Sequence, residues 1–284
     1  MIKFYEENHM YISSDGNRIP SVTGILSKLK TFDQDYWSDI SAIKKVLGIT
    51  EFKKLKSSYN KPKLTKEFIS YLLNNLDIED YISAKEDILS EWKTKNLDAC
   101  SFGTENHLIL EKESYSRGYE VNPFTQEEYV TFQKETPIDC SNESIKENLI
   151  DLEDGYYPEL LIHHPDYHYC GQADKIFIKT INGVKYVDID DYKFNNKITT
   201  YPFKNEDTGL PNTFNAPLGH VYDTKFHTYQ LQLSTYMYML ELHGLVPRYM
   251  CFTHYKDNVQ KAYPCEYQKR DVEKLTEYIL KNKQ

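Results

Sequence analysis

The segment GQADKIFIKTINGVKYVDIDDYK, residues 171–193, constrains the fold of this chain more than any other stretch. Two runs rich in β-branched and aromatic residues flank Asn182-Gly183, a pair that favours the tight turn of a β-hairpin. The pattern predicts one strand over about 169–179 and a second over 184–193. Because side chains alternate between the two faces of a strand, the charged residues of this hairpin can be assigned to faces.

Charged side chains fall on the apolar faces of both predicted strands. Asp174 shares a face with apolar residues of the first strand, and Asp191 and Lys193 continue the apolar face of the second. Asp188 and Asp190 are predicted on the opposite, wetter face. Charges are costly to bury unless they are paired or bound to a metal ion. The pattern alone leaves two interpretations open: a divalent cation held by two carboxylates, or an ordinary charge pair at a strand end.

The first interpretation has a definite chemistry. Carboxylate-bound Mg²⁺ or Mn²⁺ polarises a phosphoryl oxygen and lowers the pKa of bound water, and a lysine orients that water or stabilises the developing charge. Two pairs of residues lie one helical turn apart on predicted helices, His107 with Glu111 and Gln232 with Tyr236. Glu159, on an earlier predicted strand, is a further candidate ligand. Each of these residues also has an ordinary interpretation as a core or surface side chain.

The remaining pattern predicts an α/β chain with an additional helical region before the core. A hairpin is expected over 3–20, with a helix capped at Ser21 and helical sequence over 33–100. A separate helix should open at Thr104 and end near Gly118, and at least one helix is expected within 119–155. The later expected elements are a strand at 156–163, a long connection at 194–226, a helix at 227–244, strands at 248–256 and 259–266, and a helix at 270–282.

Charge is distributed unevenly along the chain. The net charge of −9 argues against a protein covered with phosphate contacts. Residues 44–66, however, hold eight lysines and a single acid. This stretch could follow a phosphate backbone, with Phe52 and Tyr59 available to stack on bases. The alternative is a solvated helix face.

Composition also excludes several classes of protein. The five cysteines form no Cys-x-x-Cys pair, so reduced, mostly buried thiols are expected rather than a zinc or iron–sulfur site. No run of eighteen apolar residues is present, so we expect no membrane partner. The N-terminus lacks the apolar block of a signal peptide, and we therefore expect an intracellular, cytoplasmic protein.

Five motifs occur in an order that resembles the RecB-like branch of the PD-(D/E)XK nucleases, which includes phage exonucleases and the mitochondrial genome maintenance exonuclease. They are GTENHLILE (103–111), PELLI (158–162), GQADKI (171–176), DYK (191–193) and QLSTY (232–236). IPSVTGIL (19–26) is similar to the segment ahead of the core in the mitochondrial genome maintenance exonuclease group. The resemblance implies a restriction-endonuclease-like α/β core, a mixed central sheet flanked by helices, over 99–284. Residues 1–98 would form an N-terminal hairpin and helical region that grips DNA.

The resemblance also implies roles for individual residues. Asp174 and Asp191 would bind Mg²⁺, for which Mn²⁺ would substitute, and Lys193 would be the catalytic lysine. The other implied roles are metal ligation by His107, by Glu159 and by the Tyr192 carbonyl, positioning by Gln232 and Tyr236, and support of the ligands by Glu111. One position departs from the family, because Phe194 stands where relatives often have Thr. The cysteine set of the iron–sulfur members is absent, so no cluster is expected.

The expected function is that of a Mg²⁺-dependent deoxyribonuclease, an exonuclease acting on linear duplex ends or single strands in replication, recombination or repair. Lys53, Lys54, Lys56 and Lys197 are candidates for DNA contacts. A recombination or single-strand-binding protein is a candidate partner, and the richness in Lys, Asn, Ile and Tyr is associated with AT-rich genomes such as those of phages. Two alternatives stay open: a structure- or sequence-specific endonuclease, and a non-catalytic nucleic-acid-binding subunit of the same fold.

Overall fold

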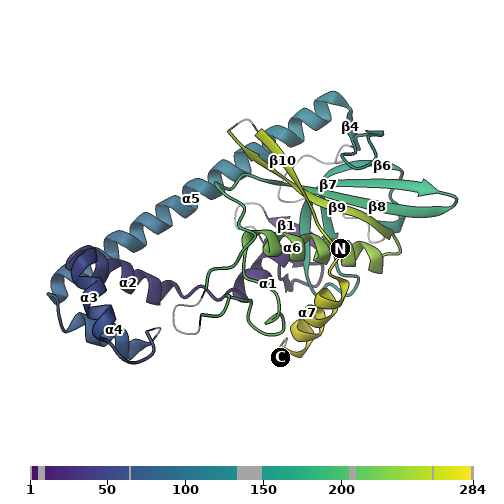
Figure 1. The fold of residues 1–284 in the computed structure, drawn as a ribbon. Coiled ribbons are helices and arrows are strands. Elements are labelled where there is room, and N and C mark those ends of the chain that lie inside the picture. Colours follow the sequence, from purple (N-terminus) through teal and green to yellow (C-terminus); the bar gives the residue numbers. More distant parts are fainter. Residues whose placement is uncertain are drawn as a thin grey trace. The chain divides into compact units, whose positions relative to one another are not determined.

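The computed structural model in Figure 1 describes residues 2–5, 10–63, 65–132, 149–204, 209–257 and 259–282. These residues contain seven α-helices and a five-stranded mixed sheet, which makes the protein an α/β protein. The chain divides into two compact units. The first comprises 1–30, 103–201 and 214–284, and the second comprises 31–102 and 202–213.

The five-stranded sheet forms the centre of the first unit, with strand order β10-β9-β8-β7-β6. Strands β8 and β9 are parallel, and the other neighbours are antiparallel. A parallel pair needs a crossover connection, and helix α6 lies between β8 and β9 in the chain. The predicted strands and this helix are confirmed, with the bounds β6 Gly155–His163, β7 Cys170–Ile181, β8 Val184–Lys193, α6 Lys225–Leu242, β9 Val246–Lys256 and β10 Val259–Pro264.

The β7–β8 turn has the geometry that its sequence predicts. Asn182 and Gly183 have φ angles of 51° and 78°, the left-handed conformation that a two-residue hairpin turn of this kind requires. The turn sets the register, in which Ile181 lies opposite Val184 and Lys175 lies opposite Asp190. This register carries Asp174 and Asp191 to the far end of the hairpin.

Helices cover the apolar face of the sheet (Figure 1). Helix α6 packs across β6, β7, β8 and β9, and α7 (Lys269–Lys281) packs against α6. Helix α1 (Val22–Lys28) contacts α6 and β7, and it begins at the predicted cap, since the Ser21 hydroxyl accepts a hydrogen bond from the Gly24 N–H at 3.1 Å. The core between these layers contains Ile176, Ile178, Val187, Ile189, Leu233, Met237 and Phe252, all nearly inaccessible to solvent.

Two small sheets complete the first unit. The predicted N-terminal hairpin is found as β2 (Met10–Ser13) and β3 (Arg18–Ile19), with β1 (Ile2–Tyr5) added to its edge. The second is the hairpin of β4 (Tyr119–Val121) and β5 (Glu128–Val130). Residues 133–148 lie outside the described residues, so the helix predicted within 119–155 is not tested there. The described part of that range adds a 3₁₀ turn at Leu149–Asp151.

The second unit is helical. It contains α2 (Gln34–Leu47), α3 (Ile49–Ser58), α4 (Lys66–Leu73) and the first part of α5 (Ile78–Arg117). Its core is formed by Ile40, Ile43, Phe52, Phe68, Ile69 and Leu72. Among the described residues, no helix combines the length and the apolar character that crossing a bilayer requires.

The prediction of a separate helix opening at Thr104 is wrong. Helix α5 is continuous over 40 residues, and Phe102, Gly103 and Thr104 lie inside it. A glycine in a helix interior costs only about 1 kcal/mol relative to alanine, so Gly103 weakens the helix without ending it. The predicted end is confirmed, since the helix stops at Arg117 and Gly118 has a φ of 73°.

Two glycine substitutions should change stability in opposite directions. A Cβ at Gly171 would lie 2.6 Å from the Tyr236 ring, so we expect Gly171→Ala to lower the free energy of unfolding by about 1–3 kcal/mol. A Cβ at Gly103 meets no atom within 4 Å, so Gly103→Ala should raise the helix stability by about 0.5–1 kcal/mol. Urea unfolding of both variants measures the difference. Equal effects of the two would contradict the close packing of Tyr236.

Candidate metal and catalytic site

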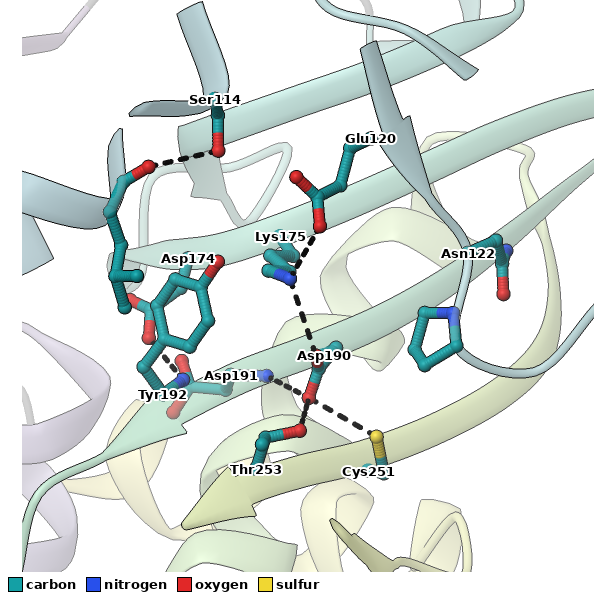
Figure 2. Close-up of polar contacts among 12 residues, drawn as sticks. Ser114, Glu120, Asn122, Asp174, Lys175, Asp190, Asp191, Tyr192, Cys251 and Thr253 are labelled. Carbon is teal, nitrogen blue, oxygen red and sulfur yellow. Dashed lines mark hydrogen bonds and ion pairs between the residues drawn. The ribbon is translucent and has the colours of Figure 1, made fainter. Parts of the chain in front are cut away.

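The site is built where strand pairing around β7 is interrupted. The β7–β8 ladder ends at Lys175–Asp190, and the β6–β7 ladder omits Glu159 and Asp174. An Asp174 carboxylate oxygen accepts a hydrogen bond from the Tyr192 N–H instead (Figure 2). Glu159 has a φ of 50°, a strained conformation for a residue with a side chain. Backbone irregularity is thus concentrated at residues that the sequence predicts as metal ligands.

Three predicted ligands from three elements converge at this interruption. His107 Nδ1, on α5, lies 3.1 Å from Asp174 Oδ1 on β7 and 3.4 Å from Glu159 Oε1 on β6. The three potential ligand atoms all lie within 4.8 Å of one another. The three side chains can therefore contact a single small cation.

Asp191 and Lys193 lie beside this cluster as a charge pair. The Lys193 ammonium donates a hydrogen bond to Asp191 Oδ2, and Asp191 is 1% exposed. The Lys193 Nζ also lies 4.8 Å from the centroid of the Tyr229 ring on α6. The negative charge of Asp191 acts on Asp174, so the pair and the three-ligand cluster belong to one electrostatic site.

The predicted positioning pair on α6 is also brought together. Gln232 Nε2 donates a hydrogen bond to the Tyr236 hydroxyl at 3.0 Å. The Tyr236 ring packs over Gly171, the first residue of the motif that contains Asp174. Burial, reinforced by the charge of Asp191, raises the pKa of Tyr236 well above its usual value, so this phenol stays neutral.

Crowding of acids changes the proton affinities in the cluster. Burial, together with the charge of Asp191, raises the pKa of Asp174 to about 7. Burial lowers the pKa of His107, but the charges of Asp174 and Glu159 outweigh this effect and raise it to about 10. Burial likewise opposes the charge of Lys193, but Asp191 and Asp174 raise its pKa, so Lys193 is an ammonium at neutral pH.

The donor set fits a hard divalent cation. When His107 is neutral, as a ligand must be, three carboxylates from Glu159, Asp174 and Asp191 face the single ammonium of Lys193. The excess of two negative charges matches one divalent cation. Carboxylate oxygens suit Mg²⁺, Ca²⁺ and Mn²⁺, and an imidazole also suits Zn²⁺ or Fe²⁺, so Mg²⁺ stays a prediction from the resemblance.

The remaining predicted residues are Glu111, the Tyr192 carbonyl and four lysines. Glu111 is buried and accepts a hydrogen bond from the Tyr115 hydroxyl at 3.2 Å. Tyr192 offers its N–H to Asp174, and the role of its carbonyl stays a prediction. Lys197 belongs to the first unit, whereas the other predicted DNA contacts, Lys53, Lys54 and Lys56, lie on α3 of the second.

Two assignments of side chains to solvent are wrong. Asp188 and Asp190, predicted on a wet face, are 0% and 2% exposed, because residues of the β4–β5 hairpin and of β9 cover and pair them. Phe52, predicted to be available for base stacking, is 5% exposed in the core of the second unit. The amphipathic pattern of α3 turns its aromatic residue inward, as in most surface helices.

One residue at the site was not anticipated from the sequence. Tyr11, on β2, donates a hydrogen bond from its hydroxyl to Gln172 Oε1 at 3.4 Å. Burial and the nearby Cys170 and Glu159 raise its pKa. No local pattern marks this tyrosine, because only the docking of the N-terminal sheet brings it to the first unit's acids.

No known protein family, no curated protein and no solved structure matches the chain. Membership of a nuclease family therefore stays a prediction from the order of the motifs.

Asp174 should be a residue that destabilises the metal-free protein. Between about pH 4 and pH 7 the folded state keeps a proton on Asp174 that the unfolded state has released, so the free energy of unfolding falls as pH rises through this range. Above pH 7 Asp174 is ionised in both states, and the free energy of unfolding stays at its lowered value. We expect Asp174→Asn to stabilise the protein in EDTA at pH 8 by about 1–3 kcal/mol, measured by urea unfolding.

Asp188→Asn is the matched control. Its carboxylate pairs with Arg248, so the substitution leaves the half-buried guanidinium facing a neutral amide. This should lower the free energy of unfolding by about 2–4 kcal/mol. Mn²⁺ should raise the melting temperature of the unmodified chain and of Asp188→Asn, but not of Asp174→Asn. A destabilised Asp174→Asn variant in EDTA would contradict the raised pKa.

Proposed function

We propose that the first unit has a PD-(D/E)XK-type core and is a metal-dependent nuclease that hydrolyses DNA phosphodiester bonds from strand ends. One observation carries the proposal. Acids from two adjacent strands, a lysine and a helical histidine meet at a buried point, where carboxylates outnumber the ammonium groups. A structural network would balance its charges, whereas three carboxyl groups here meet two basic groups, Lys193 and His107.

A divalent cation bound there would supply the chemistry that the side chains lack, by polarising a phosphoryl oxygen and lowering the pKa of water. His107, Glu159, Asp174 and Asp191 are the residues that would hold it. Mg²⁺ is the proposed cofactor, with Mn²⁺ as a substitute, and no iron–sulfur cluster is part of the proposal.

Lys193 and Tyr236 would act on the phosphodiester by charge and position. Because Lys193 is protonated and held by Asp191, it suits stabilisation of developing negative charge better than proton abstraction. Tyr236 is a neutral phenol held by Gln232, and it packs against the backbone of the Asp174 strand. It would therefore fix the position of the site rather than exchange protons with water.

Several further features support DNA as the substrate. The order of the five motifs favours an exonuclease over other enzymes that use the same core. Exposed lysines on α3 and at Lys197 provide local positive charge on a chain whose net charge is −9. A recombination or single-strand-binding protein is the proposed partner, and the cytoplasm is the proposed compartment.

The first test uses end-labelled linear DNA, single- and double-stranded, with Mg²⁺ or EDTA. We expect metal-dependent release of nucleotides, which Lys193→Ala should reduce at least about 100-fold, as expected for loss of a charge that stabilises the transition state. Lys274→Ala, at an exposed position on α7, is the control and should retain full activity.

The same assay separates the alternatives. Cleavage of a closed circle as fast as a linear duplex would favour an endonuclease. Metal-independent binding of DNA without hydrolysis, in both Mg²⁺ and Mn²⁺, would favour a non-catalytic subunit. A Lys193→Ala variant as active as the unmodified chain would rule out the proposed site.

The lysines of α3 can be tested separately from the chemistry. Replacing Lys53, Lys54 and Lys56 together by Gln should weaken single-strand binding and reduce the slope of log affinity against log salt by about 2. The matched control replaces Lys269, Lys274 and Lys281 of α7, which changes the net charge equally. Fluorescence anisotropy at several salt concentrations measures both. Equal losses in the two triple variants would show a general charge effect and contradict a DNA contact on α3.

A further inference from the structure

The face of β7 and β8 opposite to the proposed metal site carries a second buried set of charges (Figure 2). Lys175 follows Asp174, Asp190 precedes Asp191, and Lys175 and Asp190 lie directly opposite each other in the ladder. Because side chains alternate across a strand, Asp174 and Asp191 each have a charged neighbour on the other face. Lys175 is 7% exposed and Asp190 is 2% exposed, so these charges are as buried as the site itself.

Lys175 lies between two carboxylates. Its Nζ is 3.0 Å from Glu120 Oε1 on β4 and 3.9 Å from Asp190 Oδ2, and it lies 4.7 Å from the centroid of the Tyr192 ring. Burial lowers the pKa of Lys175, but Asp190 and Glu120 outweigh this effect and raise it. The lysine is therefore an ammonium that joins β4, β7 and β8.

Asp190 joins β8 to its other neighbour. Its Oδ1 accepts hydrogen bonds from Thr253 Oγ1 at 2.9 Å and from Cys251 Sγ at 3.1 Å, both on β9 (Figure 2). The same oxygen accepts a hydrogen bond from the Asp191 N–H at 3.0 Å. The Asp190 carboxylate thus connects the Thr253 and Cys251 side chains of β9 with the backbone of Asp191 in the proposed site.

Two consecutive backbone amides at the site are held by side-chain carboxylates. The Asp191 N–H donates to Asp190 on one face, and the Tyr192 N–H donates to Asp174 on the other (Figure 2). The ladder with β7 has ended at this point of β8. On the β7 side these bonds therefore restrain the backbone that carries Asp191 and Lys193, while pairing with β9 continues on the other side.

Stability alone does not account for such a network. Apolar residues of similar volume often replace a buried ion pair with little loss of stability or with a gain. Second-layer partners of metal ligands, by contrast, set ligand orientation, and their loss commonly lowers metal affinity by about 10–100-fold.

We propose that Lys175 and Asp190, held by Glu120 and Thr253, are positioning residues that set the spacing of Asp174 and Asp191 for the cation. This inference rests on the metal site proposed above and adds a second set of residues on which that site depends. The Lys175 and Asp190 side chains themselves lie on the opposite face of the strands from Asp174 and Asp191. Their effect passes through the backbone of residues 174–175 and 190–192.

The protein contains a matched control for this proposal on the same face. Asp188, two residues before Asp190 on β8, is 0% exposed and pairs with Arg248, whose Nε lies 2.8 Å from Asp188 Oδ1. It also accepts hydrogen bonds from Asn122 Nδ2 at 2.7 Å and from the Tyr249 N–H at 3.2 Å. Asp188 is as buried as Asp190, while the Arg248 side chain is 18% exposed against 9% for Lys175. Neither Asp188 nor Arg248 adjoins Asp174 or Asp191 in the chain.

The experiment compares two charge-neutral double variants of the full chain, Lys175→Met/Asp190→Val and Arg248→Met/Asp188→Val. Neither changes the net charge, so a difference in cation affinity cannot come from the long-range field. Mn²⁺ affinity is measured by calorimetry and stability by urea unfolding. We expect the first variant to bind Mn²⁺ about 10–100-fold more weakly, and the second to remain within about 3-fold of the unmodified chain.

Each outcome decides between a positioning role and a structural one. Weaker Mn²⁺ binding in the first variant only, with similar stability losses in both, supports the proposal. Equal Mn²⁺ affinity in both variants would overturn it, whatever their stabilities. If the unmodified chain itself binds no Mn²⁺, the metal site and the proposed nuclease function fail as well, so the two failures are distinguishable.

Thr253→Val tests the positioning role of Asp190 if the first double variant does not fold. This nearly isosteric change keeps every charge and removes one of the donors that hold Asp190. We expect a Mn²⁺ affinity lowered by about 3–10-fold and a kcat lowered with little change in KM for DNA. Unchanged Mn²⁺ affinity in a folded Thr253→Val protein would overturn the proposal.

Discussion

Burial of carboxylates on two adjacent strands is the constraint on which the rest of the first unit depends. Asp174 and Asp191 lie at the end of the β7–β8 hairpin, where pairing between the strands has stopped, and burial together with their mutual repulsion raises the pKa of Asp174 to about 7. His107, Lys193 and the Tyr192 N–H compensate this repulsion in part. A bound cation would complete the compensation, so a feature that weakens the metal-free protein favours metal binding.

The position of β8 explains why so many charges are buried together. It lies between parallel β9 and antiparallel β7, and both of its faces are covered. Its apolar residues and Asp191 face the helices, whereas Asp188 and Asp190 meet groups from the β4–β5 hairpin, β7 and β9. Acids therefore lie on both faces of β8 with different partners. Contacts of Asp188 and Asp190 on one face can change the position of Asp191 on the other through the shared backbone.

Much of the first unit follows from local pattern. Asn182-Gly183 and the alternation on either side predict the hairpin, Ser21 predicts the start of α1, and the spacing of Gln232 and Tyr236 predicts their contact on α6. These predictions succeed because turns, caps and i, i+4 pairs depend on near neighbours in the chain. Gly103 shows the limit of this reasoning. Whether the helix continues through it depends on the summed helix-forming tendency of the residues around it, not on the glycine alone.

The sequence by itself determined which residues could form a site: His107, Glu159, Asp174, Asp191 and Lys193 follow from residue type and strand or helix period. The tertiary structure decided which of them meet and what surrounds them. Sequence alternation placed Asp190 in water, whereas the packed β4–β5 hairpin and β9 bury it, and no pattern pointed to Lys175 or Tyr11. The physical reason is that alternation fixes the face on which a side chain lies, but only long-range packing determines whether that face meets solvent, a helix or another charge.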